Sequence, residues 1–287
     1  MEILRATESY ASLLFALPQL DPTTVLSVFF LTLARLLPIF TLAPFLGSKN
    51  LPMTIRMMFS VALVAIFLPQ NLMNVQGAIP FGGAFILYAA KELLIGFFLG
   101  FLAAVPFYIA QMAGSLIDHQ RGSSALQVTD PTTQSQTGPI GVLYNYLLIA
   151  VFFSLGGPFI FFDGIANSYQ LIPVDRMLST QFVAAQIPFW KQIFSILQVT
   201  MTLSLQISAP ALIGILLTDL FLGIANRLAP QVQIVFLGIS LKSWVGIALM
   251  TAAWSLIIQV MGKESIAWFK LINQWIQQVG FYSRGGS

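Results

Sequence analysis

Several charged side chains lie inside long apolar runs of this sequence, where a charge is costly. The most informative are Arg35, Lys91, Glu92, Asp219 and Lys242. A charged group at membrane depth is tolerated when it faces protein or water, so such residues mark a structural or functional site. The sequence therefore predicts that these charges are held against polar partners and kept away from lipid.

Lys91 and Glu92 are neighbours in the sequence. On a helix they point about 100° apart, so we expect them not to pair simply with each other and to find partners elsewhere. The alternative is that Lys91 extends to the membrane interface while Glu92 is capped or paired locally. Glu92, Gly96, Gly100 and Ala104 follow at four-residue spacing, a pattern typical of close helix packing. It predicts that this helix packs against protein.

Catalytic constellations are absent from the sequence. His119 is the only histidine, there is no cysteine, and no His-Glu-x-x-His or Gly-x-Ser-x-Gly motif occurs. A Walker-type phosphate loop is missing too, so any energy source must lie on another protein. We therefore expect no enzyme, no metal and no cofactor, and we interpret His119 as an ordinary hydrogen-bonding loop residue.

The composition indicates a membrane protein. Of 287 residues, 57% are hydrophobic and only 8% are charged, at a mean hydropathy of +0.85. A soluble domain carries about 25% charged residues, so lipid or protein must cover much of this exterior. The 13 basic and 10 acidic residues are scattered singly, which excludes a nucleic-acid footprint. We expect one integral membrane domain over residues 1–284, with Gly285 to Ser287 as a non-native addition.

A spanning helix needs about 20 mainly apolar residues. The candidate runs are 24–46, 53–73, 81–117, 141–162, 187–222 and 233–261. The third and fifth are too long for one crossing, and they predict a tilted helix, an extension beyond the bilayer or a hairpin, with breaks at Pro106 and Pro210. Asp21-Pro22 and Asp130-Pro131 each predict a helix start, since a capping side chain precedes a proline at the first helical position.

The two ends of the chain predict interfacial segments. Residues 1–20 do not resemble a cleaved signal peptide, and we expect a short segment that lies at the interface or on a partner. The last helix is expected to be amphipathic and to lie at an interface or on a partner. Its apolar positions are Trp268, Leu271, Ile272, Trp275, Ile276 and Val279. Basic residues nearly balance across the membrane, with a slight lean that puts both termini in the cytoplasm.

Residues 114–139 form the longest polar stretch between apolar runs, with glycines, hydroxyls and amides but few charges. One interpretation is an exposed loop. The other is a polar element that lines or plugs an aqueous path, because a segment with so few charges packs reversibly without strong electrostatic attraction.

Three motifs, in order, resemble the SctT/FliR family of type III secretion export apparatus proteins, which includes YscT, SpaR and HrcT. They are Glu92-x3-Gly96-x3-Gly100, the segment from Ala113 to Gly122 that leads to Asp130-Pro131, and the segment from Leu222 to Gln231 followed by Lys242 and Gly246. The resemblance covers nearly the whole chain, and Asp118-x-Gln120-Arg121-Gly122 favours the injectisome branch over the flagellar one.

The resemblance implies an all-α membrane protein that is one subunit of a helical export-gate cone in the bacterial inner membrane. Residues 1–186 would form an SctR-like part, and residues 187–284 an SctS-like hairpin with a C-terminal amphipathic helix. The implied partners are several SctR-like and SctS-like subunits around one copy of this chain, an SctU-like switch protein, exported unfolded proteins and membrane lipid. Part of the cone would be raised towards the periplasm.

The resemblance also implies roles for individual residues. Residues 115–132 would help to plug the export path. The plug region would include Gly114, Asp118, Gln120, Arg121 and Gly122, with Asp130 and Pro131 capping the helix that leaves it. The turn of the hairpin would include Arg227, Pro230 and Gln231, with Lys242 nearby.

The alternative function is a secondary transporter of a small solute. In that hypothesis Lys91, Glu92 and Asp219 form an intramembrane charge relay. Such transporters contain paired repeats with broken helices at matching positions, and the sequence shows no convincing repeat.

Overall fold

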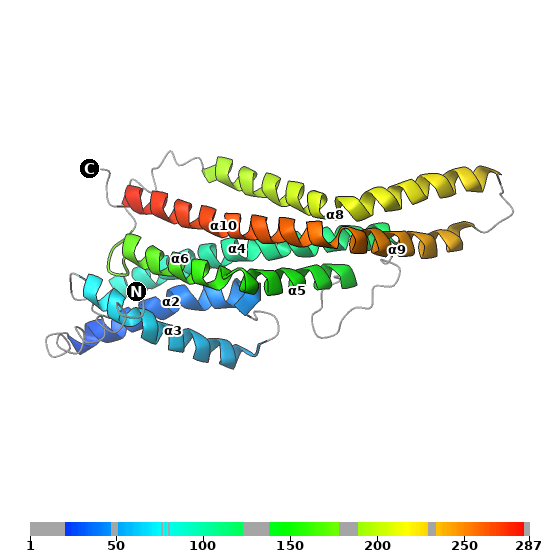
Figure 1. Ribbon diagram of the computed structural model, residues 1–287. Helices are drawn as coiled ribbons and strands as arrows, with labels where there is room; N and C mark the ends of the chain where they lie inside the picture. Colours follow the sequence, from blue (N-terminus) through cyan, green and yellow to red (C-terminus); the bar gives the residue numbers. More distant parts are fainter. Residues whose placement is uncertain are drawn as a thin grey trace. The chain divides into compact units, whose positions relative to one another are not determined.

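All the regular secondary structure in the described part of the chain is helical. The computed structural model describes residues 21–46, 51–75, 77, 79, 81–122, 138–177, 189–228 and 234–283. Within these ranges there are eight α-helices, one short 3-10 helix and no strand, so the all-helical prediction is confirmed there (Figure 1). The helices are α2 (Pro22–Leu42), η2 (Pro44–Leu46), α3 (Met53–Asn74), α4 (Gly83–Gln120), α5 (Pro139–Ser154), α6 (Gly157–Leu171), α8 (Phe189–Leu228), α9 (Ile234–Ala252) and α10 (Trp254–Ser283).

Four helices, α2, α3, α4 and α8, are long and apolar enough to cross a membrane. Two further pairs, α5 with α6 and α9 with α10, pass the same test together but are bent at a short break by 76° and 64°. The described residues therefore supply four spans, or six if each bent pair counts as one. The first span begins as predicted, because Asp21 caps α2 and Pro22 occupies its first turn.

The predicted breaks at Pro106 and Pro210 were wrong. Both prolines lie inside continuous helices, α4 of 38 residues and α8 of 40 residues. Membrane helices tolerate proline, because neighbouring helices and side chains pair with the backbone group that proline leaves without its hydrogen bond. The actual breaks follow Ser154, where Gly156 has a φ of 72°, and Ala252. Each of them divides a run that the sequence treats as one helix.

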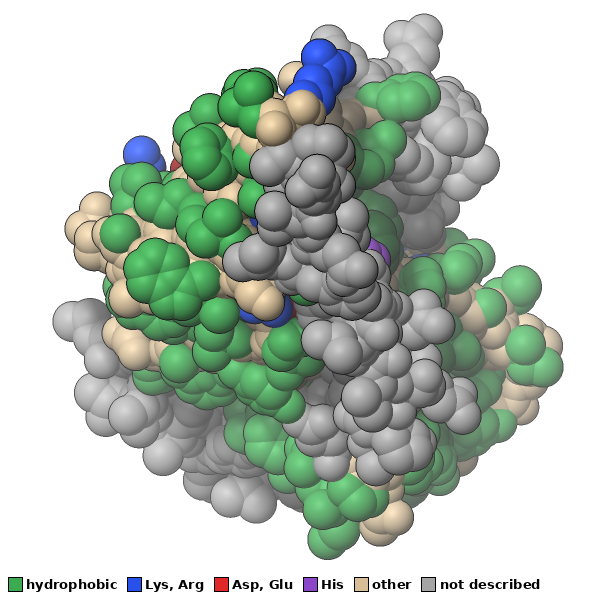
Figure 2. Space-filling model, turned by 90° about the vertical axis from the view of Figure 1, so that its right-hand side faces the viewer, with side chains coloured by type: hydrophobic (Ala, Val, Ile, Leu, Met, Phe, Trp, Pro, Cys, Tyr) green, Lys and Arg blue, Asp and Glu red, His purple; other side chains and the backbone are tan. Residues whose placement is uncertain are grey.

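The surface of the described residues is apolar. Figure 2 shows hydrophobic side chains over most of the visible described area, with only scattered Lys and Arg side chains. Phe159, Leu228 and Trp244 are 82%, 82% and 72% exposed. So much exposed apolar surface requires lipid or protein to cover it.

The chain divides into two compact units. The first comprises residues 1–104, 158–187 and 269–287, and the second comprises residues 105–157 and 188–268. In the first unit, the ring of Phe45 packs edge-on against Phe161 and Phe269, with centroids 4.9 and 6.2 Å away. Such aromatic pairs bury large apolar areas in a defined geometry.

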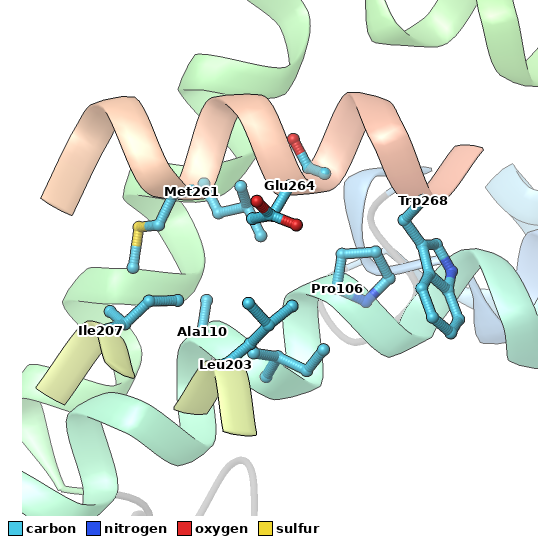
Figure 3. Close-up of a pocket in the computed structure, with 10 residues that line it drawn as sticks. Pro106, Ala110, Leu203, Ile207, Met261, Glu264 and Trp268 are labelled. Atoms are coloured by element: carbon cyan, nitrogen blue, oxygen red, sulfur yellow. The ribbon is translucent and has the colours of Figure 1, made fainter. Parts of the chain in front are cut away.

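The second unit contains α5, α8 and α9 together with the end of α4 and the start of α10. It contains a cavity of about 20 Å³ into which Glu264 points (Figure 3). The other labelled lining residues are apolar: Pro106, Ala110, Leu203, Ile207, Met261 and Trp268. One water needs about 10–15 Å³ of such space, so this cavity is too small for an organic substrate.

Candidate functional site

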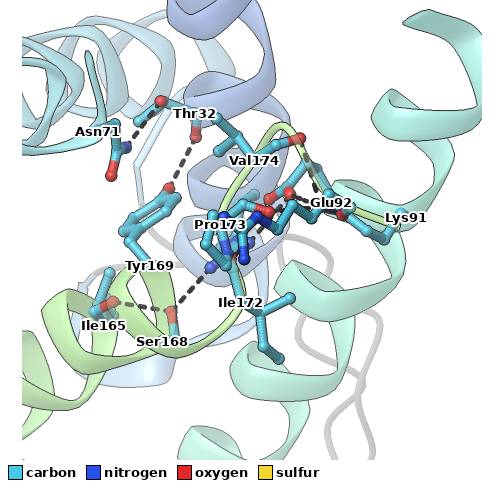
Figure 4. A network of polar contacts seen from close by, with 12 residues as sticks. Thr32, Asn71, Lys91, Glu92, Ile165, Ser168, Tyr169, Ile172, Pro173 and Val174 are labelled. Atoms are coloured by element: carbon cyan, nitrogen blue, oxygen red, sulfur yellow. Dashed lines mark hydrogen bonds and ion pairs between the residues drawn. The ribbon is translucent and has the colours of Figure 1, made fainter. Parts of the chain in front are cut away.

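A buried ion-pair network joins residues of α2, α4 and α6 in the first unit (Figure 4). Arg35 of α2 donates from Nε and Nη2 to the two carboxylate oxygens of Glu92 in α4, at 2.5 and 2.9 Å. Both side chains are 0% exposed. Such a two-point contact fixes the guanidinium and carboxylate planes together, so it fixes α2 against α4.

The second basic residue of the network holds a loop. Lys91 Nζ donates to the backbone carbonyls of Pro173, Val174 and Arg176, at 2.8, 3.4 and 2.7 Å. It also lies 2.8 Å from the nearer Glu92 carboxylate oxygen. The expectation that Lys91 and Glu92 would not pair was therefore wrong, because the long Lys91 side chain spans the angle between the two positions. Their further partners do lie elsewhere in the fold, and Lys91 is buried instead of extending to an interface.

Arg35 has further partners in α6 and in the residues after it. Its Nη1 donates to Ser168 Oγ at 3.1 Å, and its Nη2 donates to the carbonyl of Ile172 at 2.8 Å. The guanidinium lies over the ring of Tyr169 at 4.2 Å, a cation–π contact. The Tyr169 hydroxyl in turn donates to the carbonyl of Thr32 at 3.0 Å. Two cations thus hold the end of α6 and the residues after it.

Small residues allow α4 to approach α2 this closely. A Cβ atom at Gly96 would overlap the backbone of Arg35, and one at Gly100 would come within 3.0–3.1 Å of the backbone at Ile39 and Pro38. The stripe that begins at Glu92 therefore lies against α2 of the same chain.

The second cluster lies where α4 ends and α5 begins. Asp118 is 4% exposed, and its Oδ2 accepts hydrogen bonds from the backbone N–H groups of Ile140 and Gly141, at 2.9 and 3.2 Å. These groups are in the first turn of α5, where N–H donors have no partner within the helix. A carboxylate at this position also complements the positive end of the helix dipole. Asp118 therefore acts as a cap for α5 supplied from another helix.

Glycines again permit the contact. A Cβ atom at Gly114 would lie 2.5–2.6 Å from the backbone of Ile140 and Gly141, and a Cβ atom at Gly138 would collide with the Asp118 carboxylate. The last turns of α4 and the first turn of α5 thus meet at backbone distance.

Arg121 completes this cluster. Its Nη2 donates to Asp118 Oδ1 at 2.7 Å, and its side chain is 10% exposed. Its Cδ lies 3.5 Å from the position of a Cβ atom at Gly246 in α9. Its buried Nε has no acceptor among the described residues. Gly122 follows with a φ of 79°, the left-handed conformation that favours glycine.

The polar stretch at 114–139 is therefore not a loop throughout. Gly114, Asp118, His119 and Gln120 are helical residues of α4, and His119 and Gln120 are exposed in its last turn. The interpretation of His119 as a loop residue was wrong. Asp130 and Pro131 lie outside the described residues, and the next described helix begins at Pro139 after Gly138.

The structure describes only some of the residues assigned to the hairpin turn. Arg227 is in the last turn of α8, while Pro230 and Gln231 lie outside the described residues. Lys242 is inside α9 and not in the turn, and it forms an ion pair with Asp219 of α8. Their side chains are 24% and 39% exposed. This pair joins the two arms of the hairpin.

Sequence reasoning found Arg35, Lys91 and Glu92 because charges are rare in apolar runs. It missed Ser168 and Tyr169, which carry no such signal, and it missed Asn71, which donates to Thr32 Oγ1 at 3.0 Å. Within the described ranges, no group of three His, Asp or Glu residues could hold a metal ion. The polar clusters hold helices and a loop in place, and their chemistry is that of capping and ion pairing.

Buried charge pairs, long apolar helices and a largely apolar exposed surface define the class of protein, a multi-pass helical membrane protein. The chain belongs to the family of bacterial export proteins, family 1, whose model matches residues 26–266. The predicted family is thereby confirmed. The chain is a membrane component of the type III secretion and flagellar export apparatus, and that family is not one of enzymes.

Named relatives come from both kinds of apparatus. The secretion system apparatus protein SsaT of Salmonella typhimurium is 28% identical over 251 residues, which cover 87% of this chain and 93% of the relative. The flagellar biosynthetic protein FliR of Bacillus subtilis is 29% identical over 233 residues, covering 81% and 88%. The surface presentation of antigens protein SpaR of Shigella flexneri is 27% identical over 219 residues, covering 74% and 79%.

Proposed function

We propose that this chain is a core subunit of an export gate in the bacterial inner membrane. With SctR-like and SctS-like subunits it forms the pore through which unfolded proteins pass, and it contributes a plug that keeps the pore closed. An SctU-like switch protein is the further partner. Family membership and the apolar exposed surface support the gate, and Asp118-x-Gln120-Arg121-Gly122 favours its use in an injectisome.

The observation that carries the plug proposal is the cap that Asp118 places on α5. It holds Ile140 and Gly141 beside the last turns of α4, so both ends of the segment 123–137 start from one polar cluster. A plug needs fixed ends, because displacement of its tip must not separate the helices that carry it. We therefore assign Asp118 and Arg121 to the base of the plug, and the blocking role to the segment between Gly122 and Gly138.

This assignment sharpens the test. Deleting residues 115–132 would remove Asp118 together with the segment, and any leak would then have two causes. Replacing residues 123–137 by a Gly-Ser sequence of equal length keeps the base intact. We expect the assembly with SctR-like and SctS-like subunits to form, and the membrane to become permeable to ions or small solutes.

The matched control is a Gly-Ser replacement of residues 47–50, which join η2 to α3 and lie outside the proposed plug. It should assemble and stay tight. A membrane that remains tight after replacement of residues 123–137 would refute the plug role.

Co-purification tests the gate itself. An export-gate subunit should be isolated with two other small membrane proteins, whereas a secondary transporter should not. In the structure, Lys91 and Glu92 are occupied by Arg35 and by backbone carbonyls, an arrangement that suits a fixed network better than a relay of moving protons.

A further inference from the structure

An apolar groove of about 260 Å³ opens on the first unit. Leu94, Phe98 and Leu102 of α4 form one wall, and Ile172 and Trp275 contribute to the others. Leu94 and Phe98 are 70% and 46% exposed, so the groove reaches the surface. An enclosed apolar cavity of about 150 Å³ already binds benzene, so this groove has room for a stretch of hydrocarbon chain.

The groove follows the axis of α4 over a defined depth. From Leu94 to Leu102 the helix rises about 12 Å at 1.5 Å per residue, and from Lys91 to Leu102 it rises about 16 Å. The hydrocarbon core of a bilayer is about 30 Å thick, so the groove matches the depth of one leaflet. The charged residues Lys91 and Glu92, both buried within the protein, precede the end of the groove at Leu94 on the same helix.

A cation lies at that same end. Arg176 is exposed, and its carbonyl accepts from Lys91 Nζ at 2.7 Å, so its backbone lies beside the side chain of a residue that precedes Leu94 by three positions in α4. It follows Ile172 by four residues, and Ile172 lines the groove. An exposed arginine on the loop that follows a groove-lining residue is complementary in charge to an anionic headgroup joined to an acyl chain.

We propose that this groove binds one acyl chain of an anionic phospholipid, with the lipid phosphate at Arg176. The Trp275 indole, which lines the groove, belongs to a residue type that is enriched where membrane meets water. The lipid would fill the space between α4, α6 and α10 of the first unit and stabilise their packing. This inference does not depend on the plug, because the groove and the proposed plug base have no residue in common.

Tryptophan quenching by brominated lipid tests the proposal. In the full-length chain, Trp190, Trp244, Trp254 and Trp268 are changed to Phe so that Trp275 is the only fluorophore. The protein is placed in phosphatidylcholine vesicles that contain brominated phosphatidylglycerol or, at equal mole fraction, brominated phosphatidylcholine. We expect quenching by the anionic lipid to have an apparent affinity about fivefold higher, the preference that one Arg gives at an anionic surface.

Two variants separate the headgroup from the chain. Arg176→Gln should abolish the preference for phosphatidylglycerol and leave quenching by both lipids. Ile95→Phe fills the groove and should reduce quenching by both, whereas Leu93→Phe, on an exposed position that does not line the groove, should not. Equal quenching of the parent protein by both lipids would overturn the headgroup contact. Absence of quenching, in vesicles or in the co-purified assembly, would mean that protein covers the groove and would overturn the proposal.

Discussion

Removal of the Glu92 carboxylate should destabilise the chain more than any other single loss of a polar group in the first unit. In the structure it accepts from Arg35 at 2.5 and 2.9 Å and lies 2.8 Å from Lys91 Nζ, and these side chains are 0–3% exposed. Breaking a buried pair by removing one partner costs about 3–5 kcal/mol, because an uncompensated charge stays behind. Two cations lose the same anion here, so we expect Glu92→Ala to cost about 5 kcal/mol.

The double variant of Arg35 and Glu92 should lose less stability than the single variants suggest. Replacing both Arg35 and Glu92 by Met removes both charges and keeps apolar volume, and such replacements of buried pairs are often close to neutral. Lys91 keeps its three carbonyl partners in that variant. The cost of the double substitution should therefore be well below the sum of the single ones.

Unfolding free energies can be measured in mild detergent by titration with a denaturing detergent, followed by tryptophan fluorescence. Leu93→Ala serves as the control, since Leu93 is 45% exposed and should change stability by less than about 1 kcal/mol. A change of less than about 1 kcal/mol in the free energy of unfolding of Glu92→Ala would refute this account of the network. A double variant that loses as much stability as the Arg35 and Glu92 single variants together would refute it too.

Three further predictions concern helix contacts. Gly96→Ala should cost about 1–3 kcal/mol by forcing α4 away from α2, and should lower the yield of folded protein. Gly83→Ala should leave that yield unchanged, because a Cβ atom at Gly83 meets nothing within 4 Å. Equal yields of the two variants would contradict this prediction. Gly122→Ala should cost about 1–2 kcal/mol because of its φ of 79°, and an unchanged unfolding midpoint would argue against it. Lys242→Met should cost only about 0.2–1 kcal/mol, because its ion pair with Asp219 is partly exposed. Exchanging the two residues, so that the charges swap places, should recover the lost stability in the same unfolding assay.

The sequence predicts most helices because the apolar runs are long, and it predicts the start of α2 from a local cap. Asp21 and Pro22 show this best, since capping chemistry is local and needs no tertiary partner. The two prolines inside α4 and α8 mislead, because the cost of a proline depends on whether neighbouring groups in the fold can pair with the freed backbone carbonyl. The break after Ala252 has no local signal, since neither Gly nor Pro marks it.

The candidate site residues that the sequence reveals are charged residues within apolar runs. They are recognisable because burying a charge in apolar surroundings costs free energy. The role of Asp118 was not predictable, because its partners are the backbone N–H groups of Ile140 and Gly141, and every residue type except proline supplies such a group. Ser168 likewise becomes a hydrogen-bond partner of Arg35 only because the fold brings the two residues together. A contact between a side chain and a distant backbone leaves no pattern in the order of residues.

The same property gives the Lys91 contact an evolutionary consequence. Its ammonium group binds main-chain carbonyls at Pro173, Val174 and Arg176, so it is indifferent to the identity of those side chains. Substitutions can accumulate in that loop without loss of the contact, while Lys91 itself has no equivalent replacement. We therefore expect the loop residues to vary among relatives while Lys91 stays constant. We do not expect Lys91 and the loop residues to co-vary.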